Sequence, residues 1–189
     1  VIGSETVPYI KLGAGTFVTG GVAVPQGVRV VGEGATQTTI EVNAASIQLQ
    51  TGSSLSNLTI TRSLVTLPSI SVSTYSGSNN ITVKNVRFIG NRTCIYLQGS
   101  NHVIVDNEFE NNRTGLVIDP SGNPSVTGLV LERNRFYRNR SYAAIFLGPG
   151  DGSATQNVSA RIAHNDFIGN LAGGIELNAN TSADKVVFT

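Results

Sequence analysis

The chain has a single cysteine and neither methionine nor tryptophan among its 189 residues. One cysteine, Cys94, excludes an internal disulfide. Charged residues make up 13% of the chain and the formal net charge is +1, so the clustered lysine and arginine typical of nucleic-acid-binding proteins are lacking. No run approaches the roughly 18 consecutive apolar residues of a membrane-spanning helix. These shortages argue against a disulfide framework, nucleic-acid partners and membrane insertion.

Valine, isoleucine, threonine, serine, asparagine and 21 glycines dominate the composition. This mixture favours strands joined by tight turns. The chain starts at Val1 without a signal peptide and ends at 186–189 in what reads as a strand. We therefore expect residues 1–189 to form one domain that is a fragment of a longer protein, with any targeting segment outside it.

A repeated unit, Asn-x-Phe-x-x-Asn, organises the second half of the chain. The unit contains Phe109, Phe136 and Phe167, and a degenerate copy contains Phe88. Successive phenylalanines are separated by 21, 27 and 31 residues. Each period holds three short runs of alternating apolar residues, none long enough for a helix. Because the similarity recurs at one whole period, equivalent strands should pair in parallel, one turn above the other. The sequence predicts an all-β right-handed parallel β-helix, a solenoid of about seven coils of three short strands.

The repeat assigns roles to individual positions. The phenylalanines should point inward and stack. The asparagine three residues later should occupy a corner in a left-handed conformation and bond its equivalents in adjacent coils. A small residue should precede the next strand; the copies are Cys94, Gly115, Ala144 and Gly174. Cys94 is thus expected to be a buried apolar residue. Earlier strands are expected at 9–12, 22–24, 28–31, 39–42, 47–49 and 58–61.

Residues 15–17, 22–34 and 38–40, together with the Asn-x-Phe-x-x-Asn repeats, resemble the pectin-lyase-like right-handed β-helix superfamily. The resemblance implies the fold and a polysaccharide connection, because that superfamily includes polysaccharide lyases, glycoside hydrolases, phage tailspikes and surface adhesins. Its catalytic signatures are lacking: Asp119-Pro120, for example, is followed by Ser121 and not by histidine. Enzymatic activity therefore stays open. A lyase or hydrolase would draw its acids from Asp119, Glu132, Asp151 and Glu176, and no cofactor or metal is implied.

Three arginines follow corner asparagines in successive repeats: Arg92, Arg113 and Arg140. They should stack as like charges, with Glu110 and Glu132 as possible neighbours. Guanidinium groups match carboxylate or sulfate, so the stripe is a candidate site for an acidic polysaccharide. The alternative is a solvated corner without a ligand.

Aromatic side chains form a second candidate feature. Tyr96 and Phe146 should face outward from equivalent strands, next to the arginines, with Tyr137 and Tyr142 joining from the corners. Aromatic faces stack on sugar rings; the alternative is that a loop at 148–156 covers Phe146.

Other charged positions favour structural roles. The residues before the four phenylalanines alternate in sign and should form an ion-pair ladder across neighbouring strands: Arg87, Glu108, Arg135 and Asp166. His102 and His164 lack a metal-binding pattern and are expected at the surface.

Two main hypotheses follow for function. One is a secreted or cell-surface carbohydrate-recognition module, part of a polysaccharide-degrading protein, with Arg92, Arg113, Arg140, Tyr96, Phe146 and Tyr142 as its ligand-binding residues. The other is a structural adhesin or spike domain without catalytic activity. In either case open coil ends would expose strand edges, which favours flanking domains or homo-oligomers.

Overall fold

The computed structural model describes residues 7–62, 70–75, 77–119, 125–146, 157–177 and 182–188. These residues form strands and turns, without a helix. One sheet has 13 strands: β1 (Tyr9–Leu12), β2 (Gly15–Thr19), β4 (Arg29–Gly32), β5 (Thr38–Val42), β7 (Ser54–Thr61), β9 (Thr82–Ile89), β11 (Val103–Val105), β12 (Glu108–Glu110), β14 (Ser125–Glu132), β15 (Arg135–Tyr137), β17 (Asn157–Ala163), β18 (Asp166–Ile168) and β20 (Ser182–Phe188). The other has seven: β3 (Val22–Val24), β6 (Ile47–Leu49), β8 (Ile70–Thr74), β10 (Thr93–Leu97), β13 (Thr114–Ile118), β16 (Tyr142–Phe146) and β19 (Gly173–Leu177).

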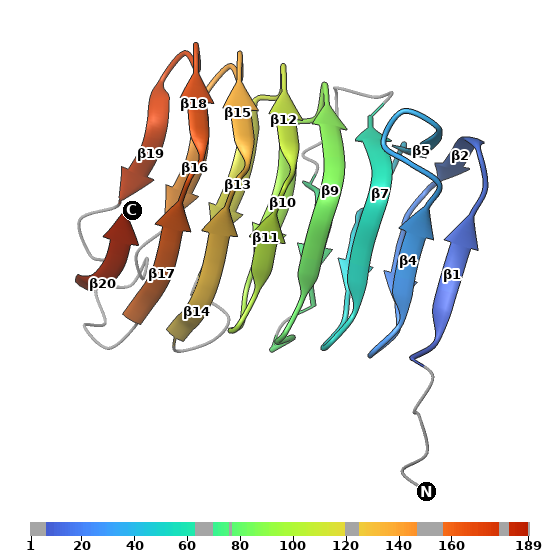
Figure 1. Ribbon diagram of the computed structural model, residues 1–189, viewed down its shortest axis with the longest axis horizontal. Helices are drawn as coiled ribbons and strands as arrows, with labels where there is room; N and C mark the ends of the chain where they lie inside the picture. The colour runs from blue at the N-terminus through green and yellow to red at the C-terminus, as the bar shows by residue number, and fades with distance from the viewer. Residues whose placement is uncertain are drawn as a thin grey trace, which may run out of the picture.

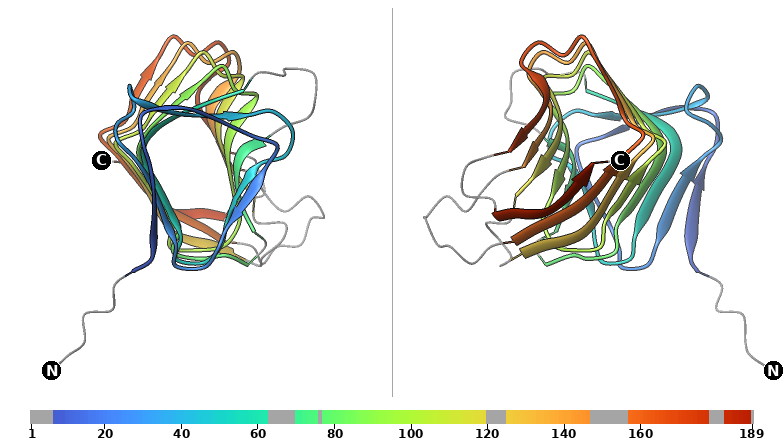
Figure 2. Two further views of the ribbon diagram at one scale, coloured as in Figure 1. Left: turned by 90° about the vertical axis from the view of Figure 1, so that its right-hand side faces the viewer. Right: turned by 60° about the vertical axis from the view of Figure 1, so that its left-hand side comes forward.

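The strands wind into a parallel β-solenoid, so the predicted fold class is confirmed. Each strand pairs in parallel with its equivalent one turn away, as in β9–β11–β14–β17 and β10–β13–β16–β19. Figure 1 shows these strands side by side along the long axis, and Figure 2 shows the turns superposed around a common interior. The solenoid has about five turns, slightly fewer than the seven coils predicted. Among the described residues β1 pairs only with β4 and β18 only with β15, and both strands are mostly exposed.

The early strands agree closely with the sequence. The expected ranges 9–12, 22–24 and 47–49 coincide with β1, β3 and β6. Strands β2 and β8 were not predicted. The predicted loop at 148–156 lies outside the described residues.

The inward phenylalanines stack as predicted. Ring centroids of Phe88 and Phe109 are 5.0 Å apart, those of Phe109 and Phe136 4.4 Å, and those of Phe136 and Phe167 5.2 Å. The interplanar angles are 3–6°. Strand register continues this row through Ile60 and Ile40 towards the first turn. A single apolar row thus runs along the solenoid axis.

The corner asparagines form a ladder, as predicted. Asn112 Oδ1 accepts hydrogen bonds from the backbone N–H and the Nδ2 of Asn91, at 2.8 and 3.1 Å, while Asn112 Nδ2 donates to the carbonyl of Phe88 at 3.0 Å. Asn139 and Asn170 continue the pattern. A parallel ladder, not predicted, joins the first asparagines of the repeat: Asn107, Asn134 and Asn165.

The left-handed residue was predicted one position too late. Positive φ angles of 54–69° occur at the residues before the ladder asparagines: Gly90, Asn111, Arg138 and Gly169. The preceding residue therefore makes the sharp turn, and the asparagine itself bonds the backbone of the adjacent turn. The chain can redirect at each corner while its buried polar groups stay satisfied.

Candidate functional site

The three predicted arginines occupy the same corner in successive turns; we call Arg92, Arg113 and Arg140 the arginine corner. The backbone N–H of Arg113 donates to the carbonyl of Asn91 at 2.8 Å, and that of Arg140 donates to Asn112 at 2.7 Å. Because each arginine follows a buried ladder asparagine, its backbone is held at a defined height. Successive positions should therefore repeat at the strand spacing of about 4.8 Å.

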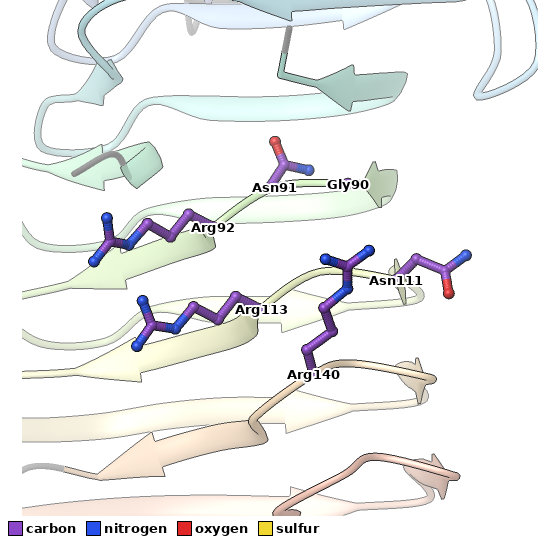
Figure 3. A pocket seen from close by; sticks show the side chains of 6 residues that line it. All are labelled: Gly90, Asn91, Arg92, Asn111, Arg113 and Arg140. Carbon is purple, nitrogen blue, oxygen red and sulfur yellow. The ribbon is translucent and has the colours of Figure 1, made fainter. Parts of the chain in front are cut away.

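The arginine corner surrounds a surface hollow of about 400 Å³. Its lining residues are Gly90, Asn91, Arg92, Asn111, Arg113 and Arg140. In Figure 3 the side chains of Arg92 and Arg113 run parallel, one above the other, whereas Arg140 turns towards Asn111. The hollow is thus bordered by guanidinium groups from three consecutive turns.

The acidic neighbours expected for these arginines are paired elsewhere. Glu110 forms an ion pair with Arg87 at 2.6 Å, and Glu132 pairs with Arg161 at 2.6 Å and with Arg133. Hydrogen bonds from Tyr137 and Arg87 hold the pKa of Glu110 below its ordinary value. Among the described residues, the ion pairs found do not involve the arginine corner. Within this part of the chain, its guanidinium groups are thus not neutralised by a carboxylate.

The strand register differs from the predicted alignment of Phe146 with Tyr96. Val117, the register partner of Tyr96, pairs with Ile145, and Phe146 pairs with Ile118. The cause is one extra corner residue: Asn112 lies four positions before Leu116, whereas Asn139 lies five before its partner Ala144. A one-residue shift exchanges the two faces of a strand. By the same shift Ala143, not Ala144, is the small residue of this repeat.

The tyrosines are divided between different surroundings. Tyr96 is half-buried on β10, and Tyr142 is half-buried opposite Gly173. Tyr137 belongs to a charged cluster: Arg135 lies over its ring at 4.6 Å, and hydrogen bonding connects it with Glu110. Burial, followed by that hydrogen bond, raises the pKa of Tyr137. None of the three lines the arginine hollow.

The predicted charge ladder is present on the first sheet. Arg87, Glu108, Arg135 and Asp166 are register partners in successive strands. Arg87 Nε lies 3.1 Å from Glu108 Oε2, and Arg135 lies 4.0 Å from Glu108. The ion pairs join Arg87, Glu108 and Arg135, which supports a structural role for these three residues.

The candidate catalytic acids occupy separate positions. Glu132 ends β14 and is held in ion pairs, Asp119 is buried just after β13, and Glu176 lies on β19. Asp151 lies outside the described residues. A general acid or base must reach the substrate with a transferable proton, and the ion-paired Glu132 is poorly placed for that task.

His102 was wrongly predicted to be a surface residue. It is fully buried: its Nδ1 accepts from the backbone N–H of Ile81 at 3.3 Å, and its Nε2 lies 3.0 Å from the carbonyl of Gln98. Nε2 therefore carries the proton of a neutral ring. Burial lowers the pKa of His102. The exposed His164 agrees with the prediction.

We expect this histidine to make stability depend on pH. The unfolded side chain has a pKa of about 6.5, and the folded one lies lower, so the unfolded state binds more protons between the two values. Stability is full above about pH 6.5 and falls as the pH drops towards the folded pKa. Each pKa unit between the unfolded and folded values changes the free energy of unfolding by about 1.4 kcal/mol. Urea unfolding from pH 7.5 down to 5 measures the effect.

His102→Gln should flatten this profile, whereas the exposed control His164→Asn should retain it. Asparagine suits the control because His164 has a φ of 54°. The hydrogen bond from Arg133 lowers the pKa of Asp106. Ion-paired carboxylates of this kind therefore change the stability only at more acidic pH. A wild-type profile that is flat across the window would contradict the assignment.

The described residues include no helix that could span a membrane. Groups of three or more histidine, cysteine or acidic side chains placed for a metal ion are not found in the same part of the chain. Cys94 is buried, as predicted, and burial raises the pKa of its thiol well above the ordinary value.

Comparison with known proteins identifies the repeat region. A family model described as the right-handed β-helix region matches residues 26–188. No curated protein and no solved structure matches the chain.

Proposed function

The chain belongs to the right-handed β-helix family, and from that premise we propose that it is a carbohydrate-recognition module that binds acidic polysaccharides at the arginine corner. The observation that carries the proposal is the hollow bordered by Arg92, Arg113 and Arg140. Guanidinium groups donate paired hydrogen bonds to carboxylate, sulfate and phosphate groups. Three of them around one hollow favour an anionic ligand.

The fold supports binding because it fixes the arginines before a ligand arrives. Each of the three follows a ladder asparagine that is at most 2% exposed: Asn91, Asn112 and Asn139. A rigid backbone reduces the conformational entropy that is lost on association. The side chains themselves remain accessible, since Arg113 and Arg140 are exposed and Arg92 is half-exposed.

A module that binds polysaccharides must meet them, and polysaccharides are abundant outside the cell. We therefore propose that the module is secreted or displayed on the cell surface. We also propose that it is part of a polysaccharide-degrading protein. Phe146 occupies the register position of Ile118 and not that of Val117, the partner of Tyr96, and Tyr96 and Tyr142 are secondary to the arginines because they lie outside the hollow.

Affinity electrophoresis tests the proposal directly. The protein should be retarded in gels that contain a uronic-acid or sulfated polysaccharide and should migrate freely through a neutral one. Substituting all three arginines (R92A, R113A and R140A) should weaken binding at least about 100-fold, since hydrogen bonds to charged groups contribute about 1.5–3 kcal/mol each.

A charge-matched control separates a defined site from general attraction. Lys11, Arg29 and Lys84 are outward cations of the first sheet, so their triple alanine variant loses the same charge elsewhere. It should bind almost as well as the natural chain. Equal losses in the two triple variants would contradict a site at the arginine corner.

A structural adhesin or spike domain is the second candidate function. It is favoured by the continuous phenylalanine and asparagine ladders and by the open first turn. Ile10, Phe17 and Val22 are 39–49% exposed, whereas their register partners Val30, Ile40 and Ile47 are at most 7% exposed. A structural role would cover this end with a flanking domain or another copy. Binding to no polysaccharide in any gel would favour this candidate.

A further inference from the structure

The arginine corner contains more hydrogen-bond donors than one carboxylate can use. A guanidinium presents its N–H groups as a planar fork, and a carboxylate has two oxygens that one fork can occupy. A second carboxylate from the protein could balance the excess, but Glu110 and Glu132 are engaged by Arg87, Arg133 and Arg161. The hollow is thus richer in donors and positive charge than a uronate group requires.

The third arginine is placed differently from the first two. Arg92 and Arg113 project in parallel from corners of equal length, because Asn91 precedes Ile95 by four positions, as Asn112 precedes Leu116. The corner at Arg140 is one residue longer, and its side chain turns towards Asn111 on the adjacent turn (Figure 3). Guanidinium groups therefore approach the hollow from more than one direction. A planar anion cannot meet all of them equally.

From this geometry we propose that the hollow selects a tetrahedral oxyanion ester on a sugar, a sulfate or phosphate ester, over a uronate carboxylate. The inference rests on the proposed function and specifies the ligand of the same site. A tetrahedral ester group has three terminal oxygens pointing in different directions, so each guanidinium can donate to a different oxygen. Arg92 and Arg113 supply affinity for any anion, and Arg140 supplies the preference for the tetrahedral group. A volume of about 400 Å³ has room for one sugar residue.

Titration calorimetry at fixed ionic strength tests this preference. The probes are three disaccharides of one backbone that carry a sulfate ester, a phosphate ester or a uronate carboxylate. We expect the sulfate or the phosphate ester to bind at least about tenfold more tightly than the uronate. Tighter binding of the sulfate ester would identify a sulfated glycan as the ligand, and tighter binding of the phosphate ester would identify a phosphorylated one.

Arg140→Gln is the decisive variant. It should weaken ester binding about tenfold and uronate binding less than about threefold, so that the preference nearly disappears. Arg29→Gln, an equal charge change on β4, should leave both affinities unchanged. Because Arg140 is exposed, an unchanged urea midpoint will show that the variant is folded.

The two proposals fail in different ways. Equal or tighter binding of the uronate, or a preference that survives in Arg140→Gln, would overturn this inference and leave acidic-polysaccharide recognition intact. No binding of any acidic probe would overturn both.

Discussion

Phe136→Ala should destabilise the folded protein by about 3–5 kcal/mol, the usual range for truncating a buried phenylalanine. Phe136 is fully buried and stacked on both faces, with ring centroids 4.4 Å from Phe109 and 5.2 Å from Phe167. Beside its ring, Gly115 has no side chain that could fill the space; a Cβ there would lie 2.9 Å from Phe136 Cδ1. Truncation therefore removes two stacking contacts and leaves a cavity in a row that runs the length of the solenoid.

Phe167→Ala is the matched control for that substitution. Phe167 ends the described stack and is only half-buried. Its truncation should cost about half as much, because partial exposure reduces both the transfer and the cavity contributions. Urea unfolding of the three proteins, followed by circular dichroism, measures the differences. Equal losses at the two positions would show that the stack does not carry the stability that its burial implies.

Asn112→Ala should cost about 3–5 kcal/mol although it removes only one small side chain. Asn112 is fully buried, and its amide serves the Phe88 carbonyl and the backbone N–H of Asn91. Each buried polar group left without a partner costs about 1–3 kcal/mol. Alanine leaves those two backbone groups unpaired, and it also breaks the side-chain contact with Asn91.

Asn111→Gly tests whether this loss belongs to the ladder and not to the corner in general. Asn111 is the exposed neighbour of Asn112 and has a φ of 55°, a conformation that glycine adopts without strain. The control should change stability by less than about 0.5 kcal/mol. A similar loss in both variants would mean that corner conformation, and not the buried amide, determines stability.

The repeat could be read from the sequence because its residues perform the same task in every turn. The phenylalanine stack, the asparagine ladder and the alternating charges of Arg87, Glu108 and Arg135 each depend on one position being repeated at the same place in the turn. Parallel strands at a constant spacing place such positions directly above one another. Alignment of the repeats was therefore enough to predict their contacts.

The predictions from the sequence failed where a contact does not recur from turn to turn. His102 is buried and accepts a hydrogen bond from the backbone N–H of Ile81, 21 positions earlier in the chain, and nothing in its local sequence pattern indicates that partner. Glu110 and Glu132 were expected near the arginine corner, but they pair with Arg87 and Arg161 on the face of the first sheet. Side-chain direction at a corner decides such pairings, and apolar periodicity does not report it.

By itself, the sequence determined the fold class, the inward phenylalanine row, the corner asparagine ladder and the alignment of Arg92, Arg113 and Arg140, because each follows from period and residue type. Only the tertiary structure decided the register of β16, where one extra corner residue pairs Phe146 with Ile118 instead of Val117. It alone also showed that Arg140, which lines the hollow, turns towards Asn111 (Figure 3). The physical reason is that a strand's two faces exchange with a shift of one residue. Corner lengths vary without changing the repeat pattern, so the register is set only when the turns pack together.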